Sequence, residues 1–127
     1  MIVLKKVAVA MLVATLFSPA ISFADWNSLR PALDDARSRL ERISRSSDFD
    51  DAKFNAGRAK SALEDAESAA ASIDCPMAHS ELDDAATMAR RARDAYDSNE
   101  FSYNVRRAIR SYNDSIDYLR LCANAKR

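Results

Sequence analysis

The regular spacing of apolar residues between positions 49 and 73 restricts the possible folds of this chain more than any other feature. Such a heptad spacing predicts an amphipathic helix that buries one narrow, Ala-rich stripe and leaves its other faces in water. The stripe needs partner helices to cover it. Eight residues form it, at alternating intervals of three and four positions: Phe49, Ala52, Ala56, Ala59, Leu63, Ala66, Ala70 and Ile73.

Three other segments have similar stripes, and the four together predict helices over residues 27–46, 49–73, 78–98 and 100–124. Alanine is abundant and Gly57 is the only glycine, a composition that favours helix nearly throughout. Short loops make consecutive helices antiparallel, so we predict an all-α, up-down-up-down four-helix bundle. The stripe of the third segment comprises Ala78, Leu82, Ala85, Ala89, Ala92 and Tyr96.

Polar residues at the expected loops indicate where the helices begin. Ser47 or Asp48 is expected to cap the second helix, since both have side-chain oxygens that can accept from its first N–H groups. Residues 74–76 resemble a turn followed by a cap, and Ser80 offers an alternative start for the third helix. Residues 98–100 are expected to cap the fourth.

The two halves of the chain resemble each other. The tetrapeptide Leu-Asp-Asp-Ala occurs at residues 33–36 and again at 82–85. Phe49 follows the first copy after 13 positions and Phe101 follows the second after 16, a difference of 3, or about one helical turn. An arginine follows each phenylalanine nine positions later. We interpret this pattern as a duplicated helical hairpin.

Residues 1–24 have the three parts of a secretory signal peptide. Lys5 and Lys6 provide the positive charge, residues 7–17 are apolar, and small residues precede a cleavage point before Asp25. A retained membrane anchor is the alternative, but the apolar run is shorter than the roughly 20 residues of a comfortable span. We therefore expect a periplasmic or secreted protein without stable membrane insertion after cleavage, formed by a single domain over residues 25–127.

The charge balance excludes a general nucleic-acid binder. After removal of the predicted signal peptide the chain retains 17 basic and 19 acidic side chains, a net charge of −2. Nucleic-acid binding proteins usually concentrate a basic excess on one face.

Cys75 and Cys122 are the only cysteines, and in an exported protein such a pair predicts a disulfide. In the predicted bundle the loop containing Cys75 and the end of the last helix lie at the same pole. Closing a loop of 47 positions stabilises the fold by about 4 kcal/mol in the chain-entropy model. A redox-active or metal-binding pair is the alternative, but the CxxC spacing typical of it is missing.

The sequence indicates neither an enzyme nor a cofactor. His79 is the only histidine, and no motif brings a nucleophile and an acid toward it. Together with Asp83 it supplies only two metal ligands, too few for a site. A Gly-rich phosphate loop and the inward Glu-x-x-His motifs of di-iron bundles are both missing.

The remaining functional signal is the set of aromatic and arginine residues outside the stripes. Aromatic and Arg side chains are the usual anchors of protein interfaces. We therefore predict a protein-interaction module (an adaptor, an inhibitor, or an immunity- or stress-type factor) that binds another envelope or secreted protein, or a second copy of itself. The alternative is a small-ligand or metal carrier that uses the bundle interior, although Ala-lined helices pack closely and leave little room there. The candidate partner-binding residues are Phe54, Tyr103, Tyr118, Arg106, Arg107 and Arg110.

Overall fold

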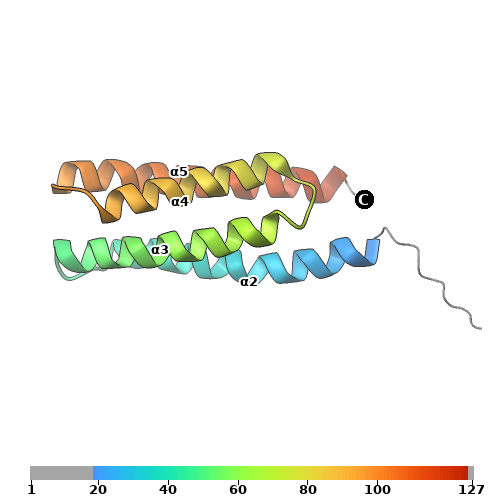
Figure 1. Cartoon of the computed structure of the whole chain (residues 1–127), viewed down its shortest axis with the longest axis horizontal. Coiled ribbons are helices and arrows are strands. Elements are labelled where there is room, and N and C mark those ends of the chain that lie inside the picture. The colour runs from blue at the N-terminus through green and yellow to red at the C-terminus, as the bar shows by residue number, and fades with distance from the viewer. Residues whose placement is uncertain (1–18, 126–127) are drawn as a thin grey trace, which may run out of the picture.

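The computed structural model describes the backbone of residues 19–125 and the side chains of residues 26–125. Within residues 19–125 the chain forms four helices and no strand: α2 (Pro19–Ile43), α3 (Phe49–Ala70), α4 (Pro76–Arg93) and α5 (Ser98–Ala125). Consecutive helices are antiparallel neighbours, α2 and α3 in one layer and α4 and α5 in the other (Figure 1). The predicted up-down-up-down bundle is confirmed. Residues 1–18, the greater part of the predicted signal peptide, lie outside the described residues.

Several helix boundaries differ from the sequence-based prediction. Because α2 begins at Pro19, Pro31 lies inside the helix rather than in its first turn, and the carbonyl of residue 27 receives no helical hydrogen bond from it. The α4 helix, the third of the four, begins at Pro76 with Cys75 at its N-cap, so the alternative start at Ser80 is wrong. It ends at Arg93 rather than near Ser98, and this early end changes the surroundings of Tyr96.

A pair of reciprocal capping hydrogen bonds lies at the start of α3, and another lies at the start of α5. These are the second helices of the hairpins α2–α3 and α4–α5. The Asp51 N–H donates to Asp48 Oδ1 at 2.8 Å, so Asp48 is the cap, one of the two residues that the sequence predicted. The Ser47 N–H also donates to Asp51 Oδ2 at 2.9 Å, a reciprocal bond that the sequence did not predict. In α5 the Glu100 N–H donates to Asp97 Oδ1 at 2.8 Å, so the cap is Asp97 and not one of residues 98–100. Each pair satisfies two N–H groups that a helix start leaves without partners.

The cap of α5 also explains why Tyr96 is not a core residue. Its N–H donates to Glu100 Oε1 at 3.1 Å, which holds the chain in a turn. The Tyr96 side chain is therefore 94% exposed, whereas Ala95 is buried. The prediction that Tyr96 completes the buried stripe of the third helix is wrong.

The two capping aspartates show that one offset relates the two halves of the chain. The spacing to Phe49 and Phe101 had instead suggested a difference of three positions between the halves. Asp48 and Asp97 are 49 positions apart, and so are the two Leu-Asp-Asp-Ala segments. One constant offset therefore relates α2 to α4 and α3 to α5, and ten of the 42 positions from 29 to 70 are identical to their equivalents. Phe49 and Phe101 are not equivalent to each other. They pack edge to face instead, with ring centroids 5.5 Å apart.

The sizes of the buried side chains determine how closely the helices approach. Fourteen of the 25 buried apolar residues are alanine, and eleven of these alanines belong to α3 and α4. Small contact residues allow helix axes to approach closely. The two remaining helices bury larger side chains where they face each other, so α2 and α5 stay farther apart. The large residues are Leu29, Leu40 and Ile43 on α2, and Phe101, Tyr112 and Leu119 on α5.

The predicted disulfide between Cys75 and Cys122 is present. Cys75 lies in the loop between α3 and α4, and Cys122 lies near the end of α5, with 6.0 Å between their Cα atoms. Figure 1 shows this loop and the C-terminal end of α5 at the same pole of the bundle. The bond therefore ties the middle of the chain to its last helix.

Replacing both cysteines by serine should lower the free energy of unfolding by about 2–4 kcal/mol, because the unfolded chain regains the entropy of an open 47-position loop. Urea unfolding followed by circular dichroism measures this change. The unmodified protein in excess reductant is the control and should unfold at the urea concentration of the double variant. An unchanged midpoint for the double variant would contradict a stabilising role for the bond.

Candidate functional site

Two aromatic side chains project into solvent, and an arginine one helical turn later lies over each ring. Phe54 on α3 is 61% exposed, and the Arg58 guanidinium carbon lies 5.7 Å from its ring centroid. Tyr103 on α5 is 52% exposed, and the guanidinium carbon of Arg107 lies 5.6 Å from its ring centroid. The predicted outward orientation of both aromatic residues is therefore confirmed.

The two pairs occupy equivalent positions in the duplicated hairpins. Each aromatic residue follows the aspartate cap of its helix by six positions, and each arginine follows it by ten. A side chain that faces solvent is not needed for packing of the core. The core therefore does not explain why an aromatic–Arg pair recurs at this position.

The pairs lie on opposite faces of the bundle. The α3 helix packs on α2 and α4 to a similar extent and α5 packs mainly on α4, so α3 and α5 have few contacts with each other and are diagonal. Phe54 and Tyr103 both lie opposite the buried stripes of their helices, so the two rings point in opposite directions. The structure thus presents two separate aromatic–Arg surfaces rather than one combined patch.

Each arginine restricts the positions that its aromatic partner adopts. An arginine over an aromatic ring gains roughly 0.5–1 kcal/mol at exposed sites. In the α5 pair, Arg107 Nη1 also donates a hydrogen bond of 3.0 Å to the Tyr103 hydroxyl oxygen. Side chains that are ordered before binding lose less entropy when a partner docks. The two surfaces are therefore built like preformed interface anchors.

The other three candidate residues have different surroundings. Arg110 is exposed and follows Arg107 by three positions, so it extends the outer face of α5. Arg106 is exposed but lines a groove between α5 and α2. Tyr118 is half-buried and packs against the core. This agrees with the expectation from the helical spacing that its side chain is at least partly exposed. Arg107 and Arg110 therefore extend the Tyr103 surface, whereas Arg106 lies between that surface and the groove.

The groove between α2 and α5 is a site that the sequence did not predict. It is an open groove of about 520 Å³ with an apolar floor, and Ile109, 38% exposed, lies on its α5 side. The Tyr112 hydroxyl donates a hydrogen bond of 2.9 Å to the Leu33 carbonyl oxygen and bridges the two helices. A second hollow continues along the same two helices beyond Tyr112. The lining residues are Arg37, Leu40, Glu41, Ile43, Ser44, Phe101, Ser102, Val105, Arg106, Ile109, Tyr112 and Asn113.

The duplication explains why this seam is open. Its equivalent in the other half is the seam between α3 and α4, where small residues allow close approach. Phe101, Val105 and Ile109 on α5 correspond to Ala52, Ala56 and Lys60 on α3. Leu40 and Ile43 on α2 correspond to Ala89 and Ala92 on α4. At four of these five positions a larger apolar residue replaces alanine, and at the fifth Ile109 replaces a lysine, so the seam opens into a groove with an apolar lining.

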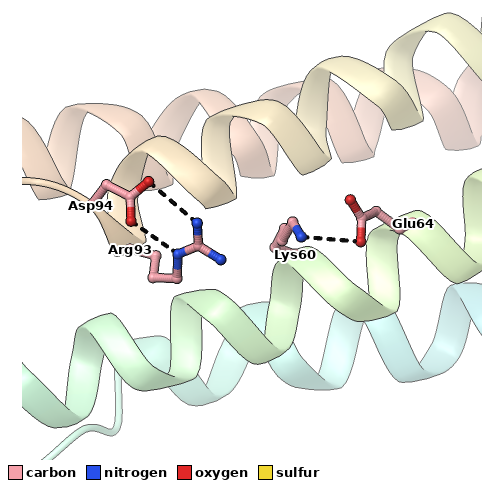
Figure 2. Close-up of polar contacts among 4 residues, drawn as sticks. All are labelled: Lys60, Glu64, Arg93 and Asp94. Carbon is pink, nitrogen blue, oxygen red and sulfur yellow. Dashed lines mark hydrogen bonds and ion pairs between the residues drawn. The ribbon is translucent and has the colours of Figure 1, made fainter.

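Gly57 makes room for an arginine side chain in the closely packed seam between α3 and α4, which we call the closed seam. A Cβ atom at this position would lie 3.2 Å from Arg93 Cδ, so glycine leaves room for the arginine stem against α3. Arg93 Nε donates to Asp94 Oδ1 at 3.0 Å, and Lys60 pairs with Glu64 at 3.3 Å (Figure 2). In the open seam the position of Gly57 is taken by Arg106.

His79 is in contact with Glu67 rather than with Asp83. Its Nε2 lies 3.4 Å from Glu67 Oε2, across the loop between α3 and α4. Burial raises the pKa of the Glu67 carboxyl, and the nearby Asp83 adds to this effect. Among the side chains of residues 26–125, no three His, Cys, Asp or Glu residues come together as metal ligands.

Comparison with known proteins identifies no relative. The chain matches no protein-family model, and no curated protein or solved structure is significantly similar to it. None of the described helices is long and apolar enough to cross a bilayer. A functional interpretation therefore has to come from the two aromatic–Arg surfaces and the groove.

Replacing Gly57 by Ala should stabilise the protein by about 1 kcal/mol when Arg93 is also replaced by Ala, because alanine favours helix over glycine by about that amount. With Arg93 present the gain should be clearly smaller, since the new methyl group displaces the arginine stem. Urea unfolding of the four proteins in this double-mutant cycle measures the difference. Equal gains in both backgrounds would show that Arg93 does not need the glycine.

Replacing Tyr112 by Phe should cost about 1 kcal/mol at pH 8, through loss of the hydrogen bond to Leu33. Burial raises the pKa of the Tyr112 hydroxyl above the ordinary tyrosine value of 10.0. The unfolded chain therefore releases this proton first, and stability falls as pH rises beyond 10. The cost of Tyr112→Phe should shrink over the same range.

Urea unfolding at pH 8 and at about pH 10.5 tests this linkage. Tyr96→Phe is the matched control, because Tyr96 is 94% exposed and its replacement should leave the decline with pH unchanged. A cost of Tyr112→Phe that is the same at both pH values would contradict the linkage.

Proposed function

We propose that this protein is an exported, non-enzymatic interaction module that binds partner proteins through its two aromatic–Arg pairs. The observation that supports this function is the recurrence of an exposed, ordered pair at equivalent positions of the duplicated hairpins. Because the two pairs point in opposite directions, the module is bivalent. Among the classes of interaction protein, this geometry favours an adaptor that holds two partner molecules, or two sites of one assembly, on opposite sides of a rigid bundle.

The chemistry of the pairs defines what they bind. An aromatic ring provides flat apolar contact area, and the arginine beside it donates several hydrogen bonds in a fixed plane. A partner surface that fits has an apolar depression next to a carboxylate. Arg110 adds a further donor beside the α5 pair, so we expect that surface to bind the more acidic site.

Export is part of the proposal. Residues 1–24 have the organisation of a secretory signal peptide, and the disulfide between Cys75 and Cys122 is of the kind that persists in oxidising compartments. We therefore place the partners in the same periplasmic or extracellular space.

Replacing Phe54 or Tyr103 by Ala should each remove one of two partner-binding sites, and the double variant should not bind. Each substitution should leave the free energy of unfolding within about 0.5 kcal/mol of the unmodified protein, because both side chains face solvent. A photocrosslinking amino acid placed at position 54 or 103 in the native cell identifies the partner. Analytical ultracentrifugation of the purified complex then measures the stoichiometry for each variant.

Tyr96→Ala is the matched control, since Tyr96 is an exposed aromatic residue that is not followed by an arginine one turn later. It should bind two partners, like the unmodified protein. A double variant that still binds with the original stoichiometry would refute the proposal.

A further inference from the structure

The open seam between α2 and α5 has features that the aromatic–Arg surfaces do not explain. Apolar side chains that would lie at closed helix contacts in an ordinary bundle line an open groove here, and Ile109 is 38% exposed in it. We propose that this groove binds an amphipathic helix of a partner protein, with its apolar face against the floor and acidic residues toward Arg106. The inference rests on the proposed interaction function but concerns a separate surface.

The dimensions of the groove fit a helix. The lining residues of α5 extend from Phe101 to Asn113. At 1.5 Å per residue this distance is about 18 Å, the length of a helix of about three turns. The second hollow continues along the same helices toward Arg120, so a longer helix has room to extend past Tyr112. Helix-in-groove binding uses this arrangement, with anchors at one-turn intervals.

The charges at the edges of the groove define the partner. Arg37 and Arg106 line the groove together with one carboxylate, Glu41. Arg37 already pairs with Asp34 at 3.1 Å. Among residues 26–125, no carboxylate lies within ion-pair distance of Arg106. Arg106 is thus available to a carboxylate of the incoming helix.

Two other occupants fit less well. A second copy that docked symmetrically would place this groove against its own equivalent, and two hollow surfaces that face each other leave both apolar floors uncovered. An alkyl ligand needs a site that encloses most of its surface. This groove is open along its length, so an alkyl chain would stay partly in water, whereas the outer face of a bound helix is polar.

Fluorescence anisotropy with two designed 15-residue helices tests the inference on the oxidised protein. Both peptides have the same leucine face; one has glutamate at the flanking positions and the other has lysine. The acidic peptide should bind at least tenfold more tightly than the basic one. Ile109→Glu should weaken its binding at least tenfold, and Arg106→Glu should reverse the preference between the two peptides.

Arg107→Glu is the matched control, because it makes the same charge change one residue further along α5, beside Tyr103 and outside the groove. It should leave peptide binding within about twofold and reduce binding at the Tyr103 surface, so the two proposals can fail separately. Equal effects of Arg106→Glu and Arg107→Glu would overturn the groove site, and so would equal binding of both peptides. Binding of a dansyl fatty acid in the groove, but of neither peptide, would show that a helix is the wrong occupant.

Discussion

The size of the side chains at the helix contacts is the constraint on which the rest of this structure depends. Alanine on α3 and α4 allows these helices to approach closely, and each alanine contributes little buried area. The fold therefore depends on long, continuous contacts between consecutive helices and on the disulfide. Where the same backbone positions hold phenylalanine, valine and isoleucine instead, the helices separate and a groove forms. Side-chain size thus determines both the close packing of the bundle and the formation of its apolar groove.

The duplication connects the fold to the proposed function. Two hairpins related by one constant offset bring equivalent positions to opposite sides of the bundle. Packing explains why buried positions such as Ala59 and Ala108 match in the two copies, but it does not explain the similarity of Phe54 and Tyr103, which face solvent. The groove shows the opposite pattern, because the residues that line it on α2 and α5 differ from the equivalent residues on α4 and α3. Repetition at one site and divergence at the other indicate two different kinds of binding surface in a small domain.

The sequence predicted the bundle, the disulfide and the outward direction of Phe54 and Tyr103, because each depends on local periodicity or on loop lengths. It failed at Tyr96, since the periodicity of the third helix continues beyond Arg93 and only the competing cap at Asp97 and Glu100 ends the helix earlier. The offset of 49 was also hidden, because the two phenylalanines seemed to be equivalent. The groove could not be predicted without knowing which helices lie next to each other across the bundle. One signal was available, namely that large buried residues concentrate in the first and last helices.

The disulfide makes the two similar halves of the chain unequal in the unfolded state. The covalent loop from Cys75 to Cys122 contains all of α4 and most of α5, whereas α2 and α3 lie outside it. When the bundle unfolds with the bond intact, the second hairpin remains a closed ring of restricted size and the first becomes an open chain. The first hairpin therefore loses more conformational freedom on folding, although its architecture is the same. The bundle is nearly symmetric in shape but asymmetric in chain entropy, and α2, one wall of the groove, belongs to the half that has no covalent restraint.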